Sequence, residues 1–206
     1  MEKPRFITLE GIEGVGKSTH VEFLSACLLD KGFDVCVTRE PGGTKLGEAV
    51  REILLHGDNL EISSDAELLL MFAARSQHIS NVILPSLNKG EIVICDRFTD
   101  ASYAYQGGGR GIDTDKIEII EKWVHKDLTP DLTLLFDASV ETGFNRLLKR
   151  GKKDRFEEED RDFFEKIRKV YLQRANDYPD RIKVIDAEKT IPEVQNQISI
   201  LMESIF

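Results

Sequence analysis

The chain has 206 residues and carries 28 Lys and Arg against 37 Asp and Glu, a formal net charge of -9; this balance argues against a protein built to grip a nucleic acid polymer, which needs clustered excess cations. Its 41% apolar and 32% charged residues are typical of a soluble globular protein, with no apolar run near the roughly 20 residues of a membrane-spanning helix and no secretory signal at the start. Three cysteines without metal-type spacing, Cys27, Cys36 and Cys95, indicate reduced packing residues in a cytoplasmic protein.

Five short runs rich in β-branched or aromatic residues alternate with longer segments of helical periodicity, which is the pattern of an α/β protein. The predicted strands are 6–10, 34–38, 91–95, 132–136 and 182–185. The predicted helices are 17–31, 44–56, 65–88, 113–126, 139–149, 160–178 and 191–205. Because each strand is apolar almost throughout, we expect a five-stranded parallel sheet with helices on both faces, within a single domain over 1–206. Ligands should bind beyond the carboxyl ends of its strands.

A phosphate-binding signature follows the first predicted strand directly. Residues 11–18 read GIEGVGKS, a full match to the loop whose glycines let successive backbone N–H groups point into one concavity. Lys17 can then reach the β- and γ-phosphates of a nucleotide, and the Ser18 hydroxyl can ligate Mg²⁺. A glycine-rich turn arising by chance would not need the strand–loop–helix context found here. The motif predicts a P-loop NTPase fold that binds ATP or GTP with Mg²⁺, and it leaves the phosphoryl acceptor open.

A second metal ligand is expected at the end of a neighbouring strand, where P-loop enzymes usually place an Asp. Asp96 follows the predicted strand 91–95 directly and precedes Arg97. An Asp in this position could instead cap the next helix, but beside a P-loop the metal-ligand role is the better interpretation. Residues 88–91 read NKGE and lack the final Asp of the N-K-x-D element that GTPases use to recognise their base.

Polar segments after two strands point to a nucleotide as the acceptor. Residues 38–44 read TREPGGT, in which Pro and two Gly favour a sharp turn at the ligand edge. A plain surface turn would not explain the charged Arg39 and Glu40 beside it. Residues 96–106 supply a cation, two phenols and small polar groups past another strand end. The glycine-rich stretch 107–111 that follows would, without a function, be a flexible loop.

A helical segment adds groups suited to a nucleobase. Within residues 71–78, which read MFAARSQH, Phe72 and Arg75 are three positions apart and share a helix face. A ring could stack there on a base, beside a guanidinium that reads the carbonyl edge of that base. Phe72 alone would be explained as a core residue, whereas the nearby Arg75 would not.

Four motifs in order, GIEGVGKST, TREPGGT, FAARSQH and DRFTDASYAYQGGGRGI, closely resemble those of bacterial thymidylate kinases, and the resemblance covers nearly the whole chain, including DRFEEED near its lid. It implies a homodimeric kinase that uses ATP and Mg²⁺ to phosphorylate dTMP to dTDP for dTTP biosynthesis. It also implies a short mobile lid, here over about 147–159. The acceptor would face ATP across the strand ends.

The resemblance assigns a role to individual positions of this chain. Arg97 would bind the dTMP phosphate with Arg39 or Arg51, and Arg75 would donate to the thymine carbonyl. Tyr105 would lie against the deoxyribose and disfavour ribonucleotides. The implied dTMP site is Glu13, Arg39, Glu40, Pro41, Arg51, Phe72, Arg75, Arg97, Ser102, Tyr105 and Gln106. The implied ATP site is Gly11, Ile12, Glu13, Gly14, Val15, Gly16, Lys17, Ser18, Thr19 and Arg146, and the implied metal ligands are Ser18, Asp96 and Glu157.

The base-stacking position departs from the family pattern. Several relatives carry the stacking Phe four residues before the Arg, a position that Met71 holds here, whereas Phe72 lies three residues before Arg75. A slight rotation of the helix would present Phe72, or Met71 could pack on the base instead. We expect Phe72 to stack on thymine.

A basic cluster at residues 146–155 would by itself be explained as a solvated helix end. The P-loop, however, offers Lys17 but no arginine, and family members with this arrangement carry a catalytic arginine in the lid. Arg150 and Arg155 are the expected catalytic arginines, acting with Lys17 and Arg97 and assisted by Lys152 and Lys153. Arg146 is expected to stack on adenine. Since the dTMP phosphate is already nucleophilic near neutral pH, catalysis would need alignment and charge neutralisation but no strong general base.

Two other functions remain open at this point. The first is a related kinase that acts on another nucleotide or on a deoxynucleoside such as thymidine. The second is a nucleotide-dependent switch or motor that hydrolyses ATP, which would leave TREPGGT and DRFTDAS unexplained.

Overall fold

The computed structural model describes residues 5–57, 60–148, 155–157 and 159–206. Its strands are β1 (Phe6–Glu10), β2 (Val35–Arg39), β3 (Ile92–Asp96), β4 (Leu132–Asp137) and β5 (Ile182–Asp186). Its helices are α1 (Lys17–Asp30), α2 (Lys45–His56), α3 (Ser64–His78), α4 (Leu84–Lys89), α5 (Thr99–Ser102), α6 (Thr114–His125), α7 (Val140–Leu148), α8 (Arg161–Asp177) and α9 (Ile191–Ile205). Two π-helical segments, η1 (Ile79–Ile83) and η2 (Tyr103–Gly109), continue α3 and α5.

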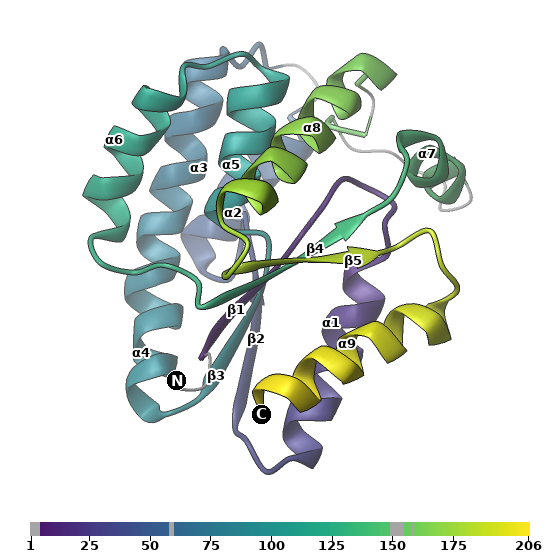
Figure 1. The fold of residues 1–206 in the computed structure, drawn as a ribbon. Coiled ribbons are helices and arrows are strands. Elements are labelled where there is room, and N and C mark those ends of the chain that lie inside the picture. The colour runs from purple at the N-terminus through teal and green to yellow at the C-terminus, as the bar shows by residue number, and fades with distance from the viewer. Residues whose placement is uncertain (1–4, 58–59, 149–154, 158) are drawn as a thin grey trace.

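The five strands form one parallel sheet in the order β2-β3-β1-β4-β5 (Figure 1). The central strand β1 is buried at every position, whereas the edge strands β2 and β5 expose some of theirs. A strand covered on both faces is mostly apolar, and three of the five residues of β1 are, which is why the sequence marks this strand so clearly. The predicted five-stranded parallel sheet is confirmed.

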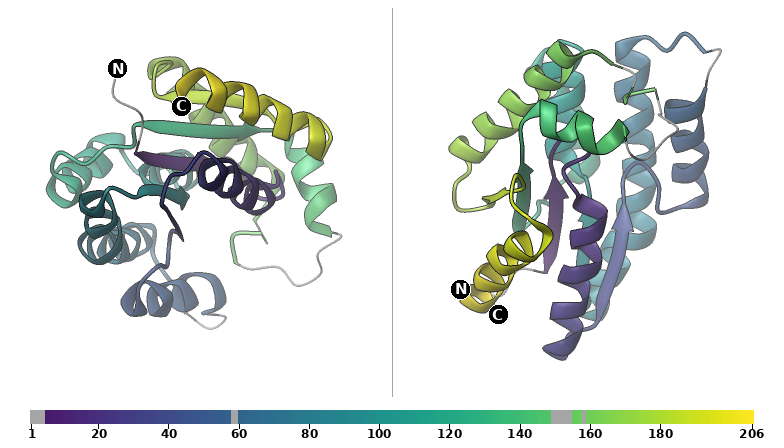
Figure 2. Two further views of the ribbon diagram at one scale, coloured as in Figure 1. Left: turned by 90° about the horizontal axis from the view of Figure 1, so that it is seen from below. Right: turned by 90° about the vertical axis from the view of Figure 1, so that its right-hand side faces the viewer.

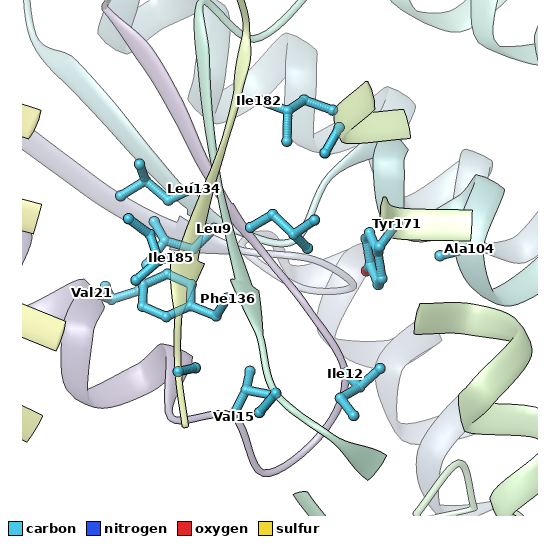
Figure 3. Packing of buried hydrophobic residues seen from close by; sticks show 14 of the residues in the cluster. Leu9, Ile12, Val15, Val21, Ala104, Leu134, Phe136, Tyr171, Ile182 and Ile185 are labelled. Atoms are coloured by element: carbon cyan, nitrogen blue, oxygen red, sulfur yellow. The ribbon is translucent and has the colours of Figure 1, made fainter. Parts of the chain in front are cut away.

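Helices cover both faces of this sheet, as predicted (Figure 2). α1 and α9 pack on one face, while α8 with η2, α3 and α6 lies over the other. Figure 3 shows part of the main core, in which Leu9, Leu134 and Phe136 from the sheet pack with side chains of neighbouring elements. Within the described ranges, no helix combines the length and the apolar character that a membrane crossing requires.

Two stretches differ from the helices predicted from the sequence. The expected helix 65–88 is α3, then η1, then α4, because one extra residue is accommodated as a π-helical turn. The first three residues of the glycine-rich stretch, 107–109, are part of η2 rather than of a loop. A Cβ on Gly108 would lie 2.7 Å from Val170 Cγ2, and one on Gly109 would lie 2.5 Å from the Phe163 ring. Glycine is needed there because α8 packs directly against η2.

Candidate active site

A cavity of about 770 Å³ opens at the carboxyl edge of the sheet, the edge at which ligands bind in such folds. Its walls come from the P-loop, the turn after β2, α3, the segment after β3 and the loop after β5. The predicted site residues that line it are Glu13, Gly14, Val15, Gly16, Lys17, Ser18, Thr19, Arg39, Glu40, Pro41, Arg51, Arg75, Asp96, Arg97, Ser102, Tyr105, Gln106, Arg146 and Glu157. Side chains that are as far apart in the sequence as Glu13 and Glu157 are therefore brought together at one site.

The P-loop owes its shape to close backbone approaches. A Cβ on Gly14, whose φ is 76°, would lie 2.2 Å from the carbonyl oxygen of Gly143. One on Gly11 would lie 2.4 Å from the carbonyl oxygen of Phe136. Only glycine fits these two positions. Gly11 and Ile12 are not among the residues that line the cavity, and they contribute their carbonyl oxygens to the inside of the loop.

Lys17 begins α1 and folds its ammonium group into the loop. The Nζ atom donates to the carbonyl oxygens of Gly11 and Ile12, at 2.9 Å in each case. Burial, and then the charge of Arg97, lowers the pKa of Lys17 from 10.5 to about 8, against the opposing effect of nearby carboxylates led by Asp96. A cation in this position is under-solvated, so an anionic ligand would find it poised for interaction.

Arg97 projects into the cavity from a strained backbone. Its φ of 70° is in the left-handed region, which costs a residue with a side chain about 1–2 kcal/mol. Its Nη2 atom donates to Glu13 Oε1 at 2.8 Å and its Nη1 atom to the Tyr171 hydroxyl at 3.2 Å. The guanidinium lies 4.7 Å from the centre of the Tyr105 ring, whose hydroxyl donates to Glu13 Oε2 at 2.5 Å. Strain of this kind concentrates where a side chain has a function.

Glu10 lies directly beneath this group, and the sequence analysis missed it. It is fully buried and accepts hydrogen bonds from the Phe98 amide and from the Tyr171 hydroxyl, both at 2.8 Å. Burial, and then the negative charge of Asp100, raises the pKa of Glu10 to about 7, although Arg97 opposes the shift. Its place at the end of β1 was the available signal, whereas nothing in the sequence points to Tyr171.

Arg75 presents one unused donor at the cavity. The side chain is 2% exposed; its Nε atom donates to Glu40 Oε2 at 2.6 Å and its Nη2 atom to the Phe98 carbonyl oxygen at 2.9 Å. Its buried Nη1 atom has no hydrogen-bond partner among the described residues. An unpaired buried donor is costly, so this atom is suited to a ligand acceptor.

Other polar side chains on this wall are held by their neighbours. Arg51 Nη1 donates to the Pro41 carbonyl oxygen at 2.9 Å, across the turn that carries the cis Glu40-Pro41 bond. Arg39 pairs with Glu48 at 2.8 Å and is half exposed. These contacts orient two arginines at the cavity mouth.

Phe72 does not reach the cavity, which corrects the sequence prediction. It is 2% exposed and packs in a cluster with Leu68 and Ile117, while Met71 and Phe98 line the cavity. One helical position turns a side chain by about 100°, so Phe72 faces α6 when Met71 faces the ligand side. Phe72 lies against the Arg75 guanidinium instead, 4.6 Å from its ring centre.

The three expected metal ligands are all residues of the cavity wall. Ser18, Asp96 and Glu157 all line it, and the buried Asp96 Oδ1 atom has no hydrogen-bond partner in the described part of the chain. An orphaned carboxylate oxygen beside a P-loop hydroxyl fits Mg²⁺, which binds through few protein carboxylates together with substrate phosphates. The described residues contain no cluster of three His, Cys, Asp or Glu ligands.

Of the two expected lid arginines, Arg155 is among the described residues and Arg150 is not. Residues 149–154 and 158, which include Arg150, Lys152 and Lys153, lie outside the described residues. Arg155 does not line the cavity: its Nη2 atom donates to Glu67 Oε2 at 2.5 Å and its Nε atom to the Leu54 carbonyl oxygen at 2.8 Å. The buried Glu67 needs a counter-charge, and this pairing holds Arg155 away from the P-loop.

The loop after β5 is a part of the wall that the sequence analysis missed. Ala187, Lys189, Thr190 and Ile191 line the cavity near Arg146, whose Nη1 atom donates to the Ala187 carbonyl oxygen at 2.9 Å. These residues follow a parallel strand, so the rule that ligands bind at the carboxyl edge could have found them.

Comparison with known proteins identifies the family. The thymidylate kinase family model matches residues 9–198. The thymidylate kinase of Ruthia magnifica subsp. Calyptogena magnifica is 52% identical over 98% of this chain and 99% of its own length, and that of Pseudomonas entomophila (strain L48) is 54% identical over 97% and 95%. The solved structure of thymidylate kinase from Ehrlichia chaffeensis matches with a TM-score of 0.80 and 34% identity, over 98% of this chain and 99% of that one. The chain therefore belongs to the thymidylate kinase family.

Proposed function

We propose that the protein transfers the γ-phosphoryl group of ATP to the phosphate of dTMP, giving dTDP and ADP. The observation that carries the proposal is that one cavity is lined both by the P-loop and by the arginines Arg75 and Arg97. The family membership of the chain supports the same reaction. In cells, such a reaction would serve dTTP biosynthesis.

ATP would occupy the P-loop side of the cavity. Its phosphates would accept from the loop amides and from Lys17, which would exchange its two carbonyl partners for phosphate oxygens. The adenine would lie between Arg146 and the loop after β5, where the guanidinium can stack on the base.

The acceptor dTMP would occupy the opposite side. Its phosphate would bind Arg97, and the free Nη1 donor of Arg75 would meet a thymine carbonyl. Tyr105 would lie along the deoxyribose, where it leaves little room for a 2′-hydroxyl. Glu13, already bonded to Arg97 and Tyr105, would accept from the 3′-hydroxyl. Met71 and Phe98 would supply the apolar contact with the base.

Charge neutralisation would be the main work of the site. The dTMP phosphate is already an anion near neutral pH, so the protein has to align two anions rather than activate a nucleophile. Ser18, Asp96 and Glu157 would hold Mg²⁺, which when bound neutralises phosphate charge. Lys17 and Arg97 would hold the donor and acceptor phosphates close together against their repulsion.

The products distinguish this proposal from its alternatives. ³¹P NMR of the enzyme with ATP, Mg²⁺ and dTMP should show the diphosphate signals of dTDP and ADP growing together. Release of inorganic phosphate without dTDP would support an ATPase instead. A thymidine kinase would form dTMP from thymidine and leave dTMP unchanged.

ATP binding should depend on pH through Lys17. The pKa of this ammonium is about 8 in the protein alone, and phosphate oxygens beside it would raise that value by favouring the charged form. Above pH 8 the free protein would hold Lys17 neutral, so ATP binding should take up a proton and ATP affinity should fall as the pH rises. Calorimetry in two buffers of different ionisation enthalpy, at about pH 9, measures that uptake. Equal ATP affinity at about pH 7 and pH 9 would contradict this dependence on Lys17.

We further propose that the protein forms a homodimer through the outer faces of α2, α3 and α6. α3 lies between the other two helices, and each exposes large apolar side chains. They are Leu46 and Ile53 on α2, Leu69 on α3, and Ile119 and Trp123 on α6. Trp123 is 80% exposed, and large apolar side chains exposed together on neighbouring helices are a feature of interaction surfaces.

Trp123→Glu should convert the dimer into monomers. A carboxylate in the middle of an apolar interface would have to lose its hydration without a partner, which costs several kcal/mol. Light scattering after gel filtration should give the mass of two chains for the wild type and of one chain for the variant. Glu118→Gln on the same helix is the matched control, since Glu118 pairs with Lys122 at the surface. A wild-type monomer, or a variant that stays dimeric, would rule out this interface.

A further inference from the structure

His78 is a fully buried side chain for which the reaction gives no role. It ends α3, one helical turn after Arg75, so the two side chains share a face. Its Nδ1 atom lies 2.9 Å from Glu40 Oε1, and its Nε2 atom lies 2.6 Å from the Thr38 hydroxyl. His78 therefore joins the turn after β2 to the helix that carries Arg75.

The direction of these hydrogen bonds follows from the chemistry of the partners. An ionised carboxylate only accepts, so Nδ1 of His78 must donate to Glu40. The other ring nitrogen of a neutral imidazole then accepts, and the Thr38 hydroxyl can donate to it. Glu40 is 6% exposed, and its second carboxylate oxygen accepts a hydrogen bond from Arg75 Nε at 2.6 Å. The result is a chain of hydrogen bonds from the half-buried Thr38 through the buried His78 and Glu40 to Arg75.

The turn is shaped to hold His78 in this position. Gly43 has a φ of 74°, and a Cβ there would lie 2.6 Å from His78 Nε2 and 2.7 Å from the Thr38 hydroxyl oxygen. A side chain at this position would displace the imidazole. The TREPGGT and FAARSQH motifs thus meet at one ring.

This chain of hydrogen bonds ends at Arg75, a residue that lines the cavity. Nε and Nη2 of Arg75 are fixed by Glu40 and by the Phe98 carbonyl oxygen, which leaves Nη1 as its buried donor without a partner in the described part of the protein. The direction of Nη1 therefore depends on the direction of the Glu40 carboxylate. That carboxylate can rotate unless its other oxygen is held.

We propose that His78 is a positioning residue for base selection, because its hydrogen bond to Glu40 fixes the plane in which Arg75 offers Nη1 to a carbonyl of the acceptor base. The inference rests on the proposed function, in which that base is thymine. With Nη1 of Arg75 held in this plane, the site favours a base with a carbonyl over one with an amino group at the same position. Cytosine carries such an amino group where thymine carries O4.

The test compares kcat/KM for dTMP with that for dCMP, together with the KM for ATP. His78→Gln removes the donor attached to Cγ and should lower the dTMP preference about tenfold, while the KM for ATP stays within about twofold. His78→Asn is the matched variant, because its amide nitrogen is attached to Cγ, as Nδ1 is, and can still donate to Glu40. It should keep the dTMP preference within about threefold of the wild type.

Each outcome decides the point. A wild-type preference in His78→Gln, or an equal loss in His78→Asn, would overturn the positioning role. Should His78→Gln fail to fold, Glu40→Gln removes the carboxylate that links His78 to Arg75, and an unchanged preference in that variant overturns the proposal equally. Arg75→Lys should lose the preference in every case, which tests Arg75 itself. A wild-type protein that leaves dTMP unphosphorylated would refute the proposed function instead.

Discussion

Arg97→Ala is expected to abolish dTMP binding at substrate concentrations that saturate the wild type. Removing one partner of a buried charge pair costs about 2–5 kcal/mol, a loss of affinity from about 30-fold to several thousandfold. The variant also leaves the Glu13 carboxylate, 14% exposed, without its cation beside an incoming phosphate. Calorimetric titration with dTMP measures the effect directly.

The substitution distinguishes the effect of the guanidinium group from that of the backbone conformation. Alanine has a Cβ, so the strained conformation at position 97 is retained and the loss reports the guanidinium. Arg168→Ala is the matched control, because Arg168 lies on α8, pairs with Asp137 at the end of β4 and does not line the cavity. The control should bind dTMP as the wild type does. Normal dTMP affinity in Arg97→Ala would mean that the acceptor site has been placed wrongly.

Lys17→Met should lower turnover by about a hundredfold to a thousandfold, the usual effect of removing one group that stabilises developing charge. Methionine has a similar length and no charge. Burial lowers the pKa of Lys17, so the folded structure disfavours the charged form of this side chain. A chain with an uncharged residue at position 17 should therefore fold without a large loss of stability. Turnover at saturating ATP and dTMP should therefore fall, while the thermal midpoint of unfolding should stay close to that of the wild type.

A control for Lys17→Met lies just past the other end of the same helix. Lys31 is exposed at the end of α1, opposite the P-loop, and Lys31→Met should turn over at the wild-type rate. A Lys17→Met enzyme within about threefold of wild-type turnover would remove the P-loop lysine from the mechanism.

The strands and the phosphate loop could be predicted because their signals are local. The apolar run of β1 is nearly continuous, since both faces of that strand are covered, and the glycines of the loop fit positions where a Cβ would collide with Gly143 or Phe136. Asp96 and Arg97 could be placed because the ends of parallel strands share one edge of the sheet.

Long-range pairings could not be predicted in the same way. Tyr171 meets Arg97 and Glu10 only because α8 folds back over the sheet, and no motif marks it. The choice between Met71 and Phe72 depends on a helix rotation of about 100°, which the sequence pattern leaves free. The pairing of Arg155 with Glu67 likewise depends on how distant segments pack, so the expected lid arginine could not be assigned from charge alone.

The central claim concerns the acceptor, and one measurement tests it most directly. ADP release coupled to a dehydrogenase assay should be followed with dTMP, dUMP, dCMP, AMP and thymidine, each over a range of concentrations. A site with Arg97 for a phosphate and Arg75 for a base carbonyl predicts the highest kcat/KM for dTMP, a lower one for dCMP and little turnover of thymidine, which has no phosphate. A preference for thymidine or AMP, or ADP release that needs no acceptor, would contradict it.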